Sequence, residues 1–224
     1  MPSIRTDISS TSTGTIANGT SDASAGVEEL DVVVVGGGFS GCRLLYELRR
    51  RGFKVKLVEA GSDLGGIWHW NTYPGARVDS QYPVYALAVP EVYETWTWTQ
   101  QYPGFDELQR YFAHIGKVLD LKKDCYFNTK VTAAEWDKAT NQWTVHCDTG
   151  RTIKTWSLIA AIGFAAKRHF PDWPGMDTFG GTIHHSSFWS PDIDFAGKKV
   201  AVIGTGATGA MLHFLHAVFA NWPS

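Results

Sequence analysis

The stretch Asp31-Val-Val-Val-Val-Gly-Gly-Gly-Phe-Ser-Gly41 decides the fold of this chain. Its run of valines is typical of a strand that is buried on both faces of a parallel sheet. The glycines at 36, 38 and 41 have the spacing Gly-x-Gly-x-x-Gly and stand directly between this strand and a helical pattern over 41–51. A motif in this position predicts a turn whose backbone and helix N-terminus bind the pyrophosphate of a dinucleotide. We call residues 36–41 the first glycine turn.

Each glycine of the first turn has a predicted role. Gly36 permits the tight turn, Gly38 lets the backbone approach a pyrophosphate, and Gly41 lets helix and sheet pack closely. A second strand is expected at 54–59, and it ends on Glu59, where an acidic side chain can hydrogen-bond ribose hydroxyls. The strand, the helix and the acid together favour a dinucleotide site over the alternative, a purely structural glycine-rich turn.

The remaining patterns predict an α/β fold with a parallel sheet and a small antiparallel meander. Residues 61–103 are crowded with Trp, Tyr, Pro and Gly and show no sustained period, which favours a long functional loop region. The further elements expected are a helix over 106–119, meander strands over 126–136, 142–147 and 151–156, and one more buried strand over 158–162.

A second glycine cluster, Gly204-Thr-Gly-Ala-Thr-Gly209, follows an expected strand over 198–203. We call residues 204–209 the second glycine turn. Two such motifs imply two dinucleotides, the usual arrangement when a nicotinamide cofactor reduces a flavin. Only 15 residues follow Gly209, with no second strand and no ribose-binding acid, so we expect this domain to be incomplete. The alternative is a remnant that binds nothing.

Composition limits the partners and the compartment. The net charge of -2 offers no basic field for nucleic acid, which favours a small-molecule partner. The three cysteines share no metal-type or C-x-x-C spacing, and no metal site is expected. No apolar run is long enough to span a membrane, and the start of the chain has no secretory signal, so a cytoplasmic protein is expected. Residues 1–28 are rich in Ser, Thr, Ala and Gly and predict a disordered leader.

Two further motifs make the sequence specific. Residues 65–79, GGIWHWNTYPGARVD, resemble the flavin-contacting loop GG(T/V)WYWNxYPGAxCD of the Baeyer-Villiger monooxygenases, a branch of the flavin monooxygenases. Residues 179–189, FGGTIHHSSFW, resemble the fingerprint FxGxxxH(T/S)xxW of the same family. The chain departs from these patterns at Ile67, His69, Val78 and Ser190. We call residues 65–79 the aromatic loop.

The resemblance covers residues 30–209 and implies a domain organisation. It implies a Rossmann-like FAD-binding domain over 29–170, a linker over 171–197, and the start of an incomplete NADP-binding Rossmann domain over 198–224. The residues that it places near FAD are Gly36, Gly38, Ser40, Gly41, Glu59, Trp68, Trp70, Asp79 and Tyr85, with further cofactor contacts at Ile67, His69 and Val131. Those that it places near NADPH are Arg77, Val78, Asp79, Thr205, Gly206, Ala207, Thr208 and Gly209. For any single aromatic residue of the loop, plain core packing is the alternative.

The resemblance also implies an activity. Members of the family use FAD and NADPH to insert one oxygen atom of O₂ next to a ketone carbonyl, giving an ester or lactone, often in secondary metabolism. Asp79 is the implied catalytic residue, because the matching family Asp holds an Arg whose counterpart is missing here. His185 is expected to couple cofactor binding to domain motion, with a structural histidine as the alternative.

Other functional classes stay open. A truncated, catalytically inactive FAD-binding module is one alternative, and an N-hydroxylating or general flavin-containing monooxygenase is another. A flavin disulfide reductase needs a redox cysteine pair, and Cys42 has no neighbour at suitable spacing. The final stretch carries an apolar stripe over 211–219 that needs a partner. Either the chain is a fragment or a mis-spliced product, or a partner chain covers this stripe.

Overall fold

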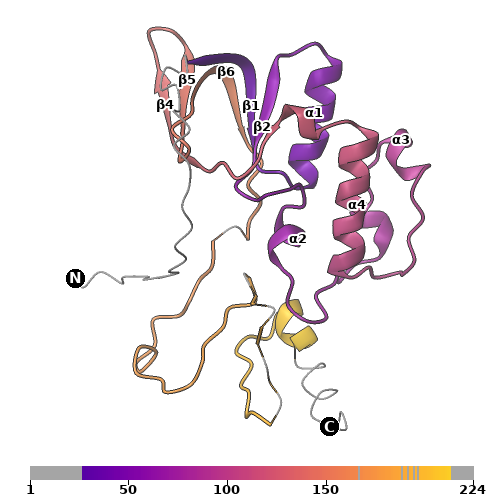
Figure 1. Ribbon diagram of the computed structural model, residues 1–224, viewed down its shortest axis with the longest axis vertical. Helices are drawn as coiled ribbons and strands as arrows, with labels where there is room; N and C mark the ends of the chain where they lie inside the picture. The colour runs from indigo at the N-terminus through magenta and orange to yellow at the C-terminus, as the bar shows by residue number, and fades with distance from the viewer. Residues whose placement is uncertain are drawn as a thin grey trace, which may run out of the picture.

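The protein is described by a computed structural model, which covers residues 27–165, 167–187, 189–190, 192–193, 195 and 197–212. In this described part, six strands form one sheet in the order β3-β2-β1-β6-β5-β4 (Figure 1). The strands are β1 (Glu28–Val35), β2 (Val55–Val58), β3 (Cys125–Tyr126), β4 (Val131–Asp137), β5 (Gln142–Cys147) and β6 (Thr152–Ala160). The helices are α1 (Phe39–Arg50), α2 (Ile67–Trp70), α3 (Pro90–Tyr93) and α4 (Phe105–Val118), with 3-10 turns η1 (Tyr82–Tyr85) and η2 (Lys122–Asp124). The predicted α/β class with a parallel sheet and an antiparallel meander is confirmed.

The sheet joins a parallel half to an antiparallel half through β6. This strand pairs in parallel with β1 and, over its first residues, antiparallel with β5. The prediction of two separate strands over 151–156 and 158–162 is therefore wrong. Ser157 interrupts the apolar pattern, but it lies in register opposite Val32 of β1, so the strand continues through it.

The predicted strand over 126–136 is instead two strands. Tyr126 ends β3, which pairs in parallel with β2 at Val58. Asn128 then adopts a φ of 49°, a left-handed conformation that interrupts extended backbone, and β4 begins at Val131. The turn sends the chain from one edge of the sheet to the other.

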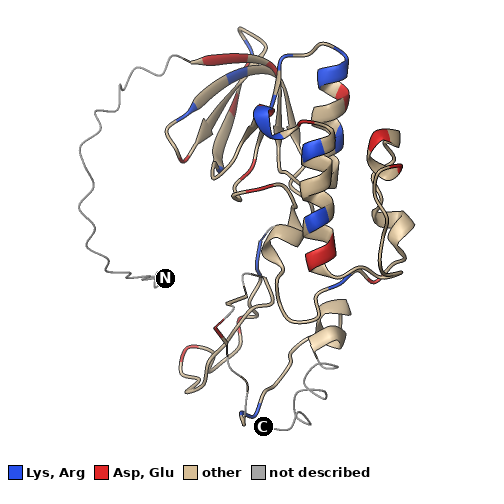
Figure 2. Ribbon diagram, turned by 45° about the vertical axis from the view of Figure 1, so that its right-hand side comes forward, with Lys and Arg blue, Asp and Glu red and all other residues tan. Residues whose placement is uncertain are grey.

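Both faces of β1 are buried, as the run of valines predicts. Val32 and Val34 belong to the larger core cluster, which includes side chains of α1 and α4. Val33 belongs to a smaller cluster that includes Val145 of β5 and Ile153 of β6. The alternation follows from the two-residue period of a strand. Lys, Arg, Asp and Glu are interspersed over the sheet and helices (Figure 2).

Between β6 and residue 206, the chain is irregular in its described residues. Residues 198–203 form no strand, so the strand predicted there is wrong for this structure. A strand is stabilised by hydrogen bonds to a neighbour, and no described segment pairs with these residues. Residues 207–212 are helical. The domain boundaries predicted at 170 and 197 remain predictions.

Two expectations fall on parts of the chain that are described only at their margins. Of the predicted leader, only residues 27 and 28 are described, and Glu28 already begins β1. Of the apolar stripe, residues 213–219 lie outside the described residues. Among the helices that are described, none combines the length and the hydropathy needed to cross a membrane.

Candidate functional site

The first glycine turn is built so tightly that side chains do not fit. Gly36 has a φ of 107°, and a Cβ there would lie 2.5 Å from the carbonyl oxygen of Ala161. A Cβ on Gly41 would lie 1.9 Å from the carbonyl oxygen of Gly36. Both distances are far inside van der Waals contact. The geometry agrees with the predicted roles of a tight turn and a close helix-to-strand approach.

The N-terminus of α1 is open to a ligand. Its cap residue, Gly38, has no side-chain hydrogen bond, and the first helical turn carries no acidic residue. A Cβ on Gly38 would approach nothing closer than the Cα of Gly66, at 3.5 Å. Ser40 is exposed in the first turn. Backbone N–H groups and the positive end of the helix dipole therefore face a space where a phosphate is stabilised.

Glu59 joins the first glycine turn to the turn that follows β2. The side chain is only 6% exposed, and each carboxylate oxygen accepts a backbone hydrogen bond. The N–H of Gly37 donates to Oε2 at 2.5 Å, and the N–H of Gly61 donates to Oε1 at 2.7 Å. Sequence reasoning placed Glu59 correctly beside the turn but missed these two partners. The available signal was Gly37, the middle glycine of the run 36–38, where a Cβ would lie 2.9 Å from Oε2 of Glu59.

The aromatic loop (residues 65–79) starts on the first glycine turn. The N–H of Gly65 donates to the carbonyl of Gly37 at 2.9 Å. Gly66 has a φ of 55°, and a Cβ there would lie 2.8 Å from the Cα of Gly38. Two glycine backbones thus pack against each other, which fixes where α2 begins. These two glycines lay inside the recognised motif, yet their packing role could not be inferred without the fold.

The aromatic side chains that were predicted to meet FAD form a cluster beside α1. Trp68 is buried and lies edge-on to Tyr85, with ring centroids 6.0 Å apart. Tyr85 in turn lies edge-on to Phe39 of α1 at 6.1 Å. Burial, followed by the negative charge of Asp79, raises the pKa of the Tyr85 hydroxyl. The structure therefore brings Trp68, Tyr85 and Asp79 together.

The other predicted residues of α2 are half-buried. Ile67, His69 and Trp70 all belong to this class. The rings of His69 and Trp70 lie perpendicular, 4.9 Å apart. His69 also approaches the turn after β2, because a Cβ on Gly61 would lie 2.8 Å from its Cδ2. The same added Cβ would lie 3.1 Å from Oε1 of Glu59, so the His69 ring and the Glu59 carboxylate are neighbours.

The end of the aromatic loop alternates between solvent and core. Arg77 and Asp79 are exposed, whereas the side chain of Val78 is buried in the larger core cluster. A cofactor contact by Val78 is therefore restricted to its backbone. Val131, at the start of β4, is half-buried and packs against the smaller core cluster, as does Val35.

The second glycine turn repeats the internal geometry of the first. A Cβ on Gly209 would lie 2.2 Å from the carbonyl oxygen of Gly204, which has a φ of 122°. Thr205, Gly206 and Ala207 are exposed, and Thr208 is half-buried. The Thr208 hydroxyl lies 3.1 Å from the hydroxyl of Tyr73, which belongs to the aromatic loop. The structure thus places this turn beside the aromatic loop.

His185 lies in the irregular segment after β6. Its Nδ1 accepts a hydrogen bond from the N–H of Ser187 at 3.1 Å, and its ring lies edge-on to Phe170. Burial, with a smaller contribution from the charge of Arg168, lowers the pKa of the imidazole. These contacts hold the ring in place, and its predicted role in coupling domain motion remains a prediction.

The cysteines have the character of inert thiols. In the described residues all three are unpaired, and burial raises the pKa of Cys42, Cys125 and Cys147. A thiol with a raised pKa is a poor nucleophile at neutral pH. No group of His, Cys, Asp or Glu suited to a metal ion occurs among the described residues.

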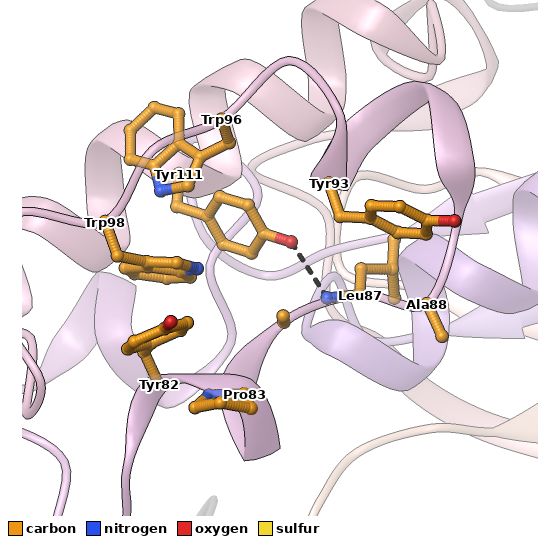
Figure 3. A pocket seen from close by; sticks show the side chains of 9 residues that line it. Tyr82, Pro83, Leu87, Ala88, Tyr93, Trp96, Trp98 and Tyr111 are labelled. Atoms are coloured by element: carbon orange, nitrogen blue, oxygen red, sulfur yellow. Dashed lines mark hydrogen bonds between the residues drawn. The ribbon is translucent and has the colours of Figure 1, made fainter.

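A separate aromatic pocket lies between η1, α3 and α4 (Figure 3). It has a volume of about 320 Å³. The Tyr111 hydroxyl accepts a hydrogen bond from the backbone N–H of Leu87 at 2.8 Å. The lining residues are Tyr82, Pro83, Ala86, Leu87, Ala88, Tyr93, Trp96, Trp98 and Tyr111, none of which was predicted to bind a cofactor.

With this geometry in place, comparisons with known proteins are informative. The sequence profile of the family described as Pyridine nucleotide-disulphide oxidoreductase matches residues 30–213. The chain belongs to this family. It is 49% identical over 82% of its length to the FAD-binding monooxygenase acrE of Aspergillus aculeatus, of which it covers 31%. It is 42% identical over 83% of its length to cyclopentanone 1,2-monooxygenase of Comamonas sp., of which it covers 34%.

A solved structure, OTEMO in complex with FAD and NADP, is similar with a TM-score of 0.77 and 36% identity, over 84% of this chain and 37% of that one. These relatives confirm the predicted resemblance to Baeyer-Villiger monooxygenases within the family. The chain spans about a third of the length of the curated relatives that it matches.

Proposed function

We propose that this chain binds FAD at the first glycine turn and NADPH between the aromatic loop and the second glycine turn. On this proposal it acts in a Baeyer-Villiger monooxygenase of secondary metabolism, in which NADPH supplies two electrons, one atom of O₂ enters the ketone to give an ester or lactone, and the other atom leaves as water. The observation that carries the proposal is the buried Glu59 carboxylate, which accepts N–H groups from both turns that border the predicted ribose site.

The residues fit FAD in shape and charge. The open backbone at Gly38 and the uncapped start of α1 would hold the pyrophosphate. Glu59 would accept hydrogen bonds from the ribose, since each carboxylate oxygen has a second lone pair. Trp68 and Tyr85 would border the ring system. When bound, FAD supplies the redox chemistry with oxygen.

The remaining assigned residues have supporting roles. Arg77 is exposed near the end of the aromatic loop and would offer a positive charge to NADPH phosphates. Asp79 is exposed and close enough to Tyr85 to influence its pKa. We propose that Asp79 orients groups at the flavin edge. The buried Trp68 would help exclude water from that edge.

The direct test is to purify the chain, add FAD, remove the excess and record the flavin absorbance. Oxygen-dependent consumption of NADPH is then followed with and without a cyclic ketone. Bound flavin with ketone-dependent ester or lactone formation supports the proposal. Absence of bound flavin contradicts it.

Two other results of the same test discriminate the alternatives. Bound flavin without turnover favours an FAD-binding module over an enzyme. When an amine is supplied to the same assay in place of the ketone, its oxygenation favours an N-hydroxylating or general flavin-containing monooxygenase. Glu59→Ala is the matched control, because this variant should lose the bound flavin under the same conditions.

A further inference from the structure

Tyr73 is a buried tyrosine whose hydroxyl contacts the far end of the described chain. Although it lies in a loop, its side chain is only 4% exposed. Its hydroxyl oxygen lies 3.1 Å from the hydroxyl oxygen of Thr208, a residue 135 positions away in sequence. The same hydroxyl lies 3.9 Å from the sulfur of Met211. Thr208 and Met211 are three residues apart and share one face of the helical segment 207–212, so the Tyr73 hydroxyl contacts that face.

The contact joins the aromatic loop, which borders both proposed cofactor sites, to the second glycine turn, which is assigned to NADPH alone. Tyr73 stands inside the aromatic loop, and its carbonyl accepts the N–H of Ala76 at 3.0 Å in the turn that leads to Arg77. The loop starts on the first glycine turn through Gly65, whose N–H donates to Gly37. A continuous series of contacts thus runs from the first glycine turn through Tyr73 to the second. Figure 1 shows the helical segment below α2, beside the loop that follows it.

Packing alone does not fix the second glycine turn. Atoms added at the Cβ positions of Gly204 and Gly206 would meet nothing within 4 Å. Residues 198–203 also lack a strand partner among the described residues. A directional hydrogen bond is therefore the kind of contact that can define the position of this turn, since it restricts both distance and angle.

We propose that the Tyr73–Thr208 hydroxyl pair is a positioning contact that sets the second glycine turn relative to the aromatic loop, and so sets NADPH relative to FAD. The inference rests on the proposed function for its ligands, but not for the contact itself. Tyr73 acts here through Thr208 and touches no reacting atom. Hydride transfer between two cofactors depends steeply on their relative placement, which is why such a contact matters.

The test uses variants that remove one oxygen atom at a time. Tyr73→Phe and Thr208→Val each delete one hydroxyl, and Thr208→Ser keeps the hydroxyl as the matched control. Hydrogen exchange is measured on the whole chain for peptides covering 204–212 and, as an internal reference, 28–41. We expect Tyr73→Phe and Thr208→Val each to speed exchange in 204–212 by about fivefold, as loss of one hydrogen bond implies, with no change in 28–41.

A second readout links the contact to the cofactors. With FAD bound, Tyr73→Phe and Thr208→Val should each weaken NADP⁺ binding in calorimetry by about fivefold, and the double variant should be no weaker than either single variant. Thr208→Ser, which keeps the hydroxyl, should restore most of the NADP⁺ affinity that Thr208→Val loses. The affinity for FAD should stay the same in all of them.

The outcomes separate the inference from the proposed function. Unchanged exchange over 204–212 in Tyr73→Phe, or additive losses in the double variant, overturns the positioning contact even if both cofactors bind. Failure of the unaltered chain to bind FAD overturns the proposed function, while the exchange comparison still decides the contact. An FAD-loaded chain that does not bind NADP⁺ overturns the role of the contact in cofactor placement.

Discussion

The two glycine turns have the same spacing and nearly the same internal contact, but different surroundings. A Cβ on Gly41 would lie 1.9 Å from the carbonyl oxygen of Gly36, and a Cβ on Gly209 would lie 2.2 Å from that of Gly204. Outside the turns the likeness ends. A Cβ on Gly36 would collide with Ala161, whereas a Cβ on Gly204 would meet nothing within 4 Å. The local shape of a Gly-x-Gly-x-x-Gly turn is thus independent of whether a sheet has formed around it.

The difference arises from strand pairing. The strand before the first turn, β1, is paired on both sides, with β2 and with β6. The corresponding residues 198–203 have no partner strand in the described chain. About half of the backbone N–H and C=O groups of a strand point to each side, and they need a neighbouring strand there to accept or donate hydrogen bonds. An apolar run without such neighbours therefore remains irregular. The first turn is therefore coupled to the stability of the whole sheet, and the second is not.

Matched alanine substitutions at the third glycine of each turn should give the largest contrast. Gly41→Ala forces α1 away from β1, and we expect it to lower the free energy of unfolding by about 3 kcal/mol. Gly209→Ala creates a similar local clash in a turn that the sheet does not constrain, so its cost should stay below about 0.5 kcal/mol. Urea unfolding followed by far-UV circular dichroism measures both. Equal losses would contradict the claim that only one turn is coupled to the sheet.

The next largest effect is expected at Glu59, a residue for which the described part of the chain contains no counterpart at the second turn. Glu59→Gln replaces one acceptor oxygen with an amide donor that faces a backbone N–H, and we expect a loss of about 2 kcal/mol in unfolding free energy. FAD affinity should fall as well, because the same group borders the ribose site. Glu135→Gln, at an exposed position of β4, is the control and should change neither quantity. A stable Glu59→Gln chain with full FAD affinity would remove Glu59 from the site.

The sequence predicted those parts of the molecule that local chemistry determines. The valine run, the glycine turn and the acid at residue 59 all lie where they were expected, because each depends on neighbours within one βαβ unit. The family resemblance placed Trp68, Tyr85 and Asp79 near one flavin, and these three side chains do lie close together, although their contact with a flavin remains a prediction.

The sequence could not predict features that depend on distant partners. Ser157 looked like a strand end, but its pairing with Val32 continues β6. The sequence did not show that the side chain of Val78 lies in the core, and the cofactor contact of this residue remains a prediction. The run at 198–203 has strand composition, but a strand exists only with something to pair with. The Tyr73–Thr208 contact bridges 135 positions and leaves no trace in a local pattern.

Substitution of the middle glycines should separate ligand binding from folding in both turns. Neither position has a positive φ or a close neighbour, so the folded chain can accept a methyl group at each. Gly38→Ala and Gly206→Ala should therefore raise the free energy of unfolding by about 0.5 kcal/mol, because alanine lowers the conformational entropy of the unfolded chain. Each methyl would nevertheless stand where a pyrophosphate must approach the backbone. We expect Gly38→Ala to weaken FAD binding alone and Gly206→Ala to weaken NADP⁺ binding alone. If either variant weakened the binding of both FAD and NADP⁺, the two turns would not bind separate ligands.

The smallest effect concerns the pH dependence of the sheet edge that supports the first turn. Burial alone would raise the pKa of Asp124, but hydrogen bonds from Lys56 of β2 and Arg49 of α1 outweigh it and lower the pKa. A depressed carboxyl pKa stabilises the fold above the pKa of the unfolded chain, and that stability is lost as the pH falls through the folded value.

Asp124→Asn should therefore flatten the decline of the urea midpoint below about pH 4, at a neutral-pH cost under about 1 kcal/mol for so small an ion network. Asp106→Asn, an exposed member of an ion pair on α4, serves as the control.

Because the Asp124 network ties α1 to β2 and η2, acid should loosen the first glycine turn before it affects the second. Hydrogen exchange over 36–41 should accelerate as the pH is lowered, relative to exchange over 204–212 in the same sample and after correction for intrinsic rates. The reverse order would mean that the second turn depends on the sheet after all.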